Sequence, residues 1–251
     1  MKTSISANAR ERMLEERFEP LLLADWAEAV FLHYAVRPEA LQPFVPFPLD
    51  LHDCMAYVSF VAFTMRHMRP SRGGKWTEWP LKPIATHEFL NLRTYVTHNG
   101  EPGIYFLAEW LPNKLSVLLG PAVFGLPYRH AAATYGHDPA QGLKGRVTDA
   151  ASGCALQYSA ETVVNETLDT AESGSLTEFL LERYTAFTSF LGLHRRFRVW
   201  HPAWRHWVVN ATIHENSLSA RTGDWHRAAR FVGAHYAPGF NDIWMGRPRL
   251  A

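Results

Sequence analysis

Residues Phe89–Trp110 read FLNLRTYVTHNGEPGIYFLAEW and decide how the chain folds. Two runs rich in β-branched and aromatic residues flank the sequence His98-Asn99-Gly100-Glu101. Asn-Gly between two such runs is the strongest short-range signal for a β-hairpin, because both central residues of the tight turn need a positive φ. The segment therefore predicts two antiparallel strands joined near Asn99 and Gly100.

Polar residues occupy every second position of the first predicted strand, at Asn91, Arg93 and Tyr95. The positions between them are mainly apolar, so one face of the strand belongs to a core and the other carries an amide, a guanidinium and a phenol. Two interpretations of the polar row are open. It is either a solvated outer face or a row turned into a cavity, where an arginine can hold a carboxylate through two hydrogen bonds.

The register of the hairpin decides where Glu109 lies. A three-residue loop pairs Asn91 with Glu109 and Tyr95 with Tyr105, which places Glu109 on the same face as Arg93. A two-residue loop shifts the second strand by one residue and turns Glu109 to the other face, because neighbouring residues of a strand point to opposite sides. The sequence does not decide between the two registers.

Other segments extend the β pattern. Strands are predicted at Trp26–Tyr34, Met55–Met68, Tyr128–Thr134, Gly145–Asp149, Gly153–Val164, Phe197–His201 and Trp207–His214. Residues 69–86 contain five Pro and Gly residues and predict a long loop suited to the rim of a cavity. A short helical turn is predicted at 38–44, and a short helix at Ser116–Phe124 that ends at Gly125.

The longest predicted helix is Ser175–Phe190. Ser175 and Glu178 form a capping box, and apolar residues follow at helical spacing. The whole pattern predicts an α+β protein built on an antiparallel β-barrel with helices packed outside. Residues 22–251 are expected to form one domain, preceded by an extension at 1–21 that holds a short charged helix.

Composition restricts the classes of partner. The 251 residues are 47% hydrophobic and carry a net charge of +1, so no strong field attracts nucleic acid or an anionic membrane. No run of 18 apolar residues predicts a membrane span, and the N-terminus does not resemble a secretory signal. Cys54 and Cys154 are expected to be buried thiols in the cytoplasm. The oligomeric state is left open.

No recognised metal or cofactor motif occurs. Thirteen histidines are present, but none forms an H-E-x-x-H pair or a Cys/His cluster, and no P-loop or G-x-G-x-x-G is found. We therefore expect neither a metal nor a cofactor. Lysines are few, and Lys114 is the only one beside predicted core segments; we expect it to cap a turn rather than to react.

Five segments of the chain carry a resemblance to a known family. They are WAEAVFLHYAVRPEALQPFVPFPLDL, NLRTYVTHNGEPGIYF, FGLPYRHA, HPAW and GAHYAPGFNDIW. With these segments the chain resembles the YqjF-like proteins of unknown function, which are related to the acetoacetate decarboxylase-like superfamily. The resemblance extends from about Leu22 to Pro248 and implies a cone-shaped antiparallel barrel around an internal cavity.

The chain departs from the decarboxylases at the residues that carry their chemistry. Those enzymes have a Y-P-K-K-L segment with a Schiff-base lysine, and Tyr128 and Arg129 occupy the matching positions here. A phenol cannot form an imine, and the acidic residue of the decarboxylases falls near Ser59. The resemblance therefore implies a retained scaffold without lysine-centred chemistry.

Two functions follow as hypotheses. The first is binding of a small organic acid or carbonyl compound in the barrel, by a set of candidate residues that comprises Asn91, Arg93, Tyr95, Tyr105, Tyr128 and Arg129. The second is an enzyme in which Tyr128 or Glu109 acts as general acid or base and Arg93 anchors an anion. A strongly perturbed pKa in the cavity would favour the enzyme.

Overall fold

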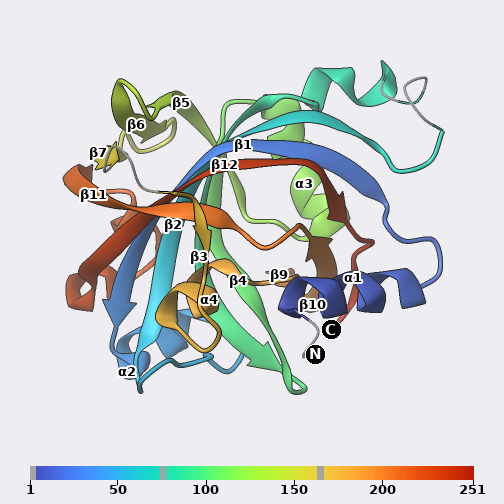
Figure 1. Cartoon of the computed structure of the whole chain (residues 1–251), viewed down its shortest axis with the longest axis horizontal. Coiled ribbons are helices and arrows are strands. Elements are labelled where there is room, and N and C mark those ends of the chain that lie inside the picture. Colours follow the sequence, from blue (N-terminus) through green and yellow to red (C-terminus); the bar gives the residue numbers. More distant parts are fainter. Residues whose placement is uncertain (1–3, 74–76, 78, 163–166) are drawn as a thin grey trace.

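The structure, a computed structural model, describes residues 4–73, 77, 79–162 and 167–251. Strands make up most of it (Figure 1). They are β1 Leu22–Val36, β2 Ala56–Pro70, β3 His87–His98, β4 Glu101–Leu111, β5 Tyr128–Asp138, β6 Gly142–Asp149, β7 Ala155–Thr162, β8 Asp169–Thr170, β9 Thr185–Phe190, β10 Leu193–Trp200, β11 Arg205–Asn216, β12 Arg230–Met245 and β13 Arg249–Leu250.

The helices are short, and all except the N-terminal α1 connect strands. The α-helices are α1 Ile5–Glu15, α2 Pro38–Leu41, α3 Lys114–Phe124 and α4 Leu176–Leu181, and the 3₁₀ turns are η1 Gln42–Phe44, η3 Trp79–Ile84, η4 Ser219–Thr222 and η5 Asp224–Ala228. The predicted helix before Gly125 is confirmed: Asn113 caps its first turn, and Gly125 ends it with a φ of 73°. The helical turn predicted at 38–44 is also confirmed, as α2 and η1.

Pairing closes the described strands into two circuits that share β12, β1, β2, β3 and β4. The larger circuit continues from β4 through β5, β6, β7 and β11 and returns to β12. The smaller circuit continues from β4 to β9 and β10 and returns to β12. The five shared strands therefore form one wall of both circuits.

The purely antiparallel barrel expected from the sequence is not what the pairing shows. β4 pairs in parallel with β5 and with β9, and the other pairings are antiparallel. The reason is local in the case of β5, because α3 crosses over between β4 and β5 and returns the chain to run in the same direction. What holds is a mostly-β α+β fold.

The larger circuit is filled with apolar side chains. One buried cluster draws on every strand of that circuit, through residues that include Val30, Phe60, Leu92, Trp110, Ala131, Val147, Leu156, Val209 and Tyr236. Because each strand contributes, this cluster must lie inside the circuit. The shared strands pack against it with one face and against the smaller circuit with the other, which explains their nearly continuous apolar sequences.

The hairpin contains both registers that the sequence left open. Asn99 and Gly100 have φ values of 51° and 76°, so they form a two-residue turn, and Arg93 pairs with Phe106. A β-bulge then shifts the pairing by one residue, and beyond it Asn91 pairs with Glu109. The bulge returns Glu109 to the face that carries Asn91 and Arg93.

The long helix predicted at Ser175–Phe190 is wrong in its second half. The cap is present, since the Ser175 hydroxyl accepts from the Glu178 amide at 3.1 Å, but α4 ends at Leu181 and Thr185–Phe190 forms β9. Apolar residues at positions 184 and 187 fit either period. Pairing of β9 with both β10 and β4 decides for the strand.

The N-terminal helix packs against the smaller circuit, close to the C-terminus (Figure 1). The Ser6 hydroxyl donates to the carbonyl of His201 at 2.7 Å, and the Trp200 indole donates to the carbonyl of Ser6 at 3.0 Å. None of the helices that the structure describes has the length and apolar character needed to cross a membrane.

The expected burial of the two cysteines is wrong. Cys54 is exposed, because it lies with a φ of 60° in the turn that precedes β2, and Cys154 is only half-buried.

Candidate functional site

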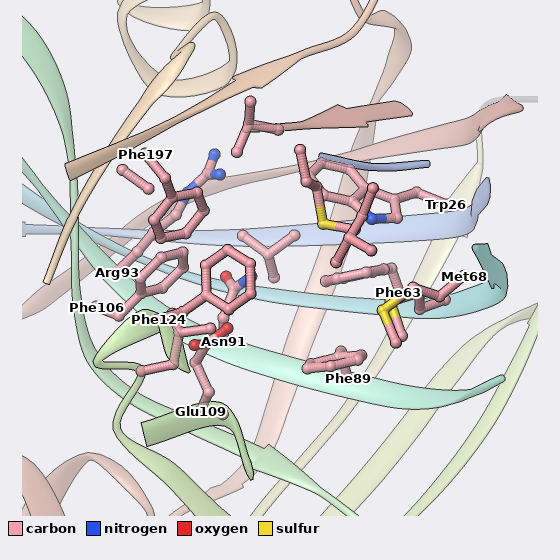
Figure 2. Close-up of a pocket in the computed structure, with 18 of the residues that line it drawn as sticks. Trp26, Phe63, Met68, Phe89, Asn91, Arg93, Phe106, Glu109, Phe124 and Phe197 are labelled. Carbon is pink, nitrogen blue, oxygen red and sulfur yellow. The ribbon is translucent and has the colours of Figure 1, made fainter. Parts of the chain in front are cut away.

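The smaller circuit contains a cavity of about 380 Å³, within the range typical of small-ligand pockets. Its walls come from the shared strands, β9, β10, α3 and η3. Most of the lining is aromatic or aliphatic (Figure 2), including Trp26, Phe31, Phe63, Met65, Phe89, Phe106, Phe124, Phe197 and Trp204. Such a lining suits the apolar part of a ligand.

Three of the buried polar side chains that line this apolar space come from nearby positions of β3 and β4. Asn91 and Arg93 are each 7% exposed, and Glu109 is 4% exposed. Figure 2 shows Asn91 and Glu109 pointing toward each other across the two strands. One polar atom of each has no hydrogen-bond partner among the described residues: Oδ1 of Asn91, Nε of Arg93 and Oε2 of Glu109.

Arg93 is held from one side only. Its Nη2 donates to the carbonyl of Leu180 at 3.0 Å, at the C-terminal end of α4, and its guanidinium lies 5.6 Å from the centre of the Phe31 ring. No carboxylate of the described residues forms an ion pair with Arg93. Glu182 is near enough for the charge of Arg93 to act on its carboxyl group, without direct contact. Burial raises the pKa of Glu182, and Arg93 partly offsets that effect.

Glu109 and Tyr128 are neighbours on the paired strands β4 and β5, and both line the cavity. Burial raises the pKa of Glu109 to about 8. Burial, and then the charge of Glu109, raise the pKa of Tyr128 well above its ordinary value. At neutral pH the carboxyl group is mainly protonated and the phenol is neutral, so both can donate a hydrogen bond.

Tyr95 shares the face of Arg93 but does not line the cavity. Its hydroxyl donates to the carbonyl of Leu180 at 2.9 Å and lies 2.7 Å from the Ser59 hydroxyl, which in turn lies 2.7 Å from His33 Nδ1. The phenol is fully buried and is used to hold the end of α4. Arg93 donates to the same carbonyl. Tyr95 therefore helps to position the group that holds Arg93, without lining the cavity itself.

Tyr105 and Arg129 also lie outside the cavity lining, although the sequence placed them in the candidate set. Tyr105 pairs with Thr94 because of the two-residue turn, and it packs against the core of the larger circuit. Arg129 follows Tyr128 on β5 and therefore turns away from it. Its Nη1 donates to the carbonyl of Arg221 at 3.3 Å.

His87 lines the cavity and was missed in the sequence. It lies at the first position of β3, between the loop predicted at 69–86 and the strand predicted from Phe89. The alternation of Asn91 and Arg93, extended backward through Phe89, would have placed it on the same face. The loop predicted at 69–86 also contributes to the cavity, because Leu81 and Ile84 line it. Residues 74–76 and 78 of that loop lie outside the described residues.

The lysines that the structure describes lie away from the cavity. Lys82, Lys114 and Lys144 are exposed, and none of them lines the cavity. Lys114 is the first residue of α3, after the cap at Asn113. In the described parts of the chain, no group of His, Cys, Asp and Glu side chains is arranged to hold a metal ion.

Solved structures show where this fold has been seen before. An acetoacetate decarboxylase-like enzyme from Sphingomonas wittichii RW1 matches with a TM-score of 0.61 at 16% identity, covering 93% of this chain and 94% of that one. The enduracididine biosynthesis enzyme MppR complexed with pyruvate matches with a TM-score of 0.64 at 14% identity, over 93% and 91% of the chains. Acetoacetate decarboxylase from Legionella pneumophila matches with a TM-score of 0.64 at 11% identity, over 92% and 87%. At these identities the likeness shows a shared fold alone.

Sequence comparison gives the family. The chain is 29% identical over 203 residues to the uncharacterized protein YqjF of Bacillus subtilis (strain 168), covering 79% of this chain and 80% of that protein. The model of the family DUF2071, described as an uncharacterized conserved protein, matches residues 23–241. That match covers most of the chain, and the chain therefore belongs to this family of YqjF-like proteins with an acetoacetate decarboxylase-like fold.

Proposed function

We propose that the cavity binds a small, largely apolar carboxylic acid or carbonyl compound without covalent attachment to a lysine. The observation that carries this proposal is the set of unpartnered polar atoms on Asn91, Arg93 and Glu109 inside a mainly apolar cavity. A buried polar group without a partner costs about 1–3 kcal/mol, so a ligand that supplies the missing partner gains this free energy on binding.

The charges of the site favour an anionic head group. Arg93 brings a guanidinium, a group that does not lose its proton in proteins, and it has no carboxylate partner among the described side chains. Glu109 is mainly neutral at pH 7 because burial raises its pKa to about 8. The guanidinium can bond a carboxylate through a planar fork, and a protonated Glu109 can donate to a carbonyl or carboxylate oxygen. The aromatic lining would take the apolar remainder of the ligand.

The binding test uses straight-chain monocarboxylates from hexanoate to dodecanoate, with their methyl esters as neutral probes, in calorimetry and thermal unfolding. Ligand at one hundred times its dissociation constant should stabilise the protein by about 2.7 kcal/mol. Arg93→Met should lose carboxylate binding, and Arg93→Lys should lose most of it because an ammonium has no planar fork.

Arg129→Met is the matched control, because this arginine lies outside the cavity lining, and it should bind as the wild type does. The proposal fails if no acid binds, or if Arg93→Met binds as tightly as the wild type.

A second candidate function is catalysis with Glu109 as general acid. A carboxyl group with a pKa of about 8 is close to the value at which proton transfer is efficient near neutral pH. In this case turnover of a 3-oxo acid or an ester should depend on a group titrating near that pKa and should vanish in Glu109→Gln. Borohydride added together with a 3-oxo acid should leave the protein mass unchanged, and an adduct on a lysine would contradict both functions as proposed.

A further inference from the structure

His87 is a buried polar residue that the proposed contacts to Arg93 and Glu109 do not use. The side chain is 6% exposed, lines the cavity and packs on Phe89 with ring centres 4.7 Å apart. Neither Nδ1 nor Nε2 has a hydrogen-bond partner among the described residues. A buried imidazole with both nitrogens free is costly, and such groups call for an explanation.

The environment keeps this imidazole neutral. Burial lowers the pKa of His87 to about 4, and the backbone of Thr86, which lies nearby without hydrogen-bond geometry, offsets only part of the effect. The groups around the ring are apolar and include Met65, which pairs with His87 across β2 and β3, and Leu81 and Ile84 of η3. A neutral imidazole offers one N–H donor and one nitrogen acceptor.

The position of His87 along β3 sets the distance to the polar groups already described. His87, Phe89, Asn91 and Arg93 alternate on one face of a strand that rises about 3.3 Å per residue. His87 therefore lies roughly 13 Å from Asn91 and roughly 20 Å from Arg93 along the strand. The wall between the two ends is aromatic, with Phe89 stacked on Phe63.

We propose that His87 forms a second polar subsite at the far end of the cavity and that it binds a hydroxyl group. This inference rests on the proposed function, because the other end of the ligand is the acid group held near Arg93. The ligand class is then an elongated apolar acid with a terminal hydroxyl. A hydroxyl group both donates and accepts, as the neutral imidazole does. A second carboxylate would meet the neutral imidazole and the apolar side chains of Met65, Leu81 and Ile84, with no cationic side chain beside them among the described lining residues.

The test compares ligands that differ only at the far end. Decanoate, 10-hydroxydecanoate and the corresponding dicarboxylate, with shorter and longer members of each series, are titrated into the wild-type protein by calorimetry. At the best chain length the hydroxy acid should bind roughly 2–10-fold more tightly than the plain acid, the range expected of one net hydrogen bond. The dicarboxylate should bind less tightly than the plain acid.

Variants assign the preference to His87. His87→Phe should bring the affinities of the hydroxy acid and the plain acid together, and His87→Gln, which keeps a donor and an acceptor, should retain part of the difference. His214→Phe, an exposed residue on β11 outside the cavity, should keep the wild-type ratio.

The outcomes separate this inference from the proposed function. Equal binding of both acids by the wild type, or an unchanged ratio in a folded His87→Phe, overturns the subsite and leaves the acid-binding cavity standing. Binding of neither acid overturns the proposed function itself, and the subsite with it.

Discussion

The two circuits differ in how they treat the same five strands. Inside the larger circuit the buried polar groups are paired: the Trp110 indole donates to Asp149 at 3.0 Å, and Tyr158 lies 2.6 Å from the imidazole of His137. Inside the smaller circuit one polar atom each of Asn91, Arg93 and Glu109 has no hydrogen-bond partner among the described residues, and all three side chains border the cavity. One circuit is therefore packed for stability, and the other keeps polar groups unsatisfied at a cost in stability.

β3 shows the difference within one strand. Leu92 is fully buried in the packed cluster, and the adjacent Arg93 faces the cavity. Neighbouring residues of a strand point to opposite faces. Each residue of a shared strand therefore packs in one circuit only, and its side chain can suit that circuit alone. We therefore expect truncations on the face packed in the larger circuit to lower the free energy of unfolding. Replacing a charged group by a neutral one on the cavity face should remove the free-energy cost of burying that group.

The largest expected effect is the pH dependence caused by Glu109. Its carboxyl has a pKa of about 8 in the folded chain against an ordinary value of 4.5, so between these values the folded chain holds one more proton than the unfolded chain. Stability should therefore fall by about 1.4 kcal/mol per pH unit across this window, on the order of 5 kcal/mol in total, and stay level above it. Below pH 4.5 the carboxyl is protonated in both the folded and the unfolded chain, so it causes no loss of stability there.

Glu109→Gln removes this titration. Urea unfolding at pH 5, 7 and 9 measures the effect. The free energy of unfolding of Glu109→Gln, relative to that of the wild type, should increase as the pH rises. Glu11→Gln, on the exposed side of α1, should follow the wild-type curve. Parallel curves for wild type and Glu109→Gln would mean that the carboxyl of Glu109 is not desolvated in the folded state.

Truncation of matched leucines compares the two packings. Leu92→Ala leaves a hole in the packed cluster and should lower the free energy of unfolding by about 2–5 kcal/mol. Leu81 is half-buried at the rim of the cavity, so Leu81→Ala removes less buried apolar surface and should cost about 1 kcal/mol or less. Chemical denaturation measures both, and equal losses would remove the contrast between the circuits.

The smallest effect tests how tightly the larger circuit is filled. A Cβ added at Gly145 would come within 2.3 Å of the Tyr158 ring, whereas a Cβ at Gly136 on the adjacent strand meets no atom within 4 Å. Gly145→Ala should therefore cost about 1–3 kcal/mol, and Gly136→Ala should be neutral or slightly stabilising. If thermal unfolding finds the two variants alike, Tyr158 has room to move and the cluster is looser than described.

Local chemistry made several parts of the fold predictable. The Asn99-Gly100 turn, the cap at Ser175 and the stop at Gly125 depend on backbone conformations that few residue types satisfy, so their sequences are specific. The same holds for the candidate site where it depends on alternation, since Asn91 and Arg93 follow from the period of one strand. His87 belongs to that period as well, and only the wrong start of the strand concealed it.

The remaining parts depend on contacts between distant segments. Nothing near Thr185–Phe190 in sequence distinguishes a helix from a strand, and the segment is a strand because β10 and β4 offer it backbone partners. Tyr105 was assigned to the wrong face for a similar reason, because its orientation depends on the register on its own side of a bulge.

The sequence by itself determined the hairpin, and it gave the polar row on β3 as one of two open interpretations, because both depend on residue type and short spacing. Only the tertiary structure decided that this row faces a cavity, that the bulge turns Glu109 toward it, and that Tyr105 and Arg129 are excluded. The physical reason is that the surroundings of each face of a strand depend on which segments pack against it. Here both faces of the shared strands are covered by segments far away in the chain.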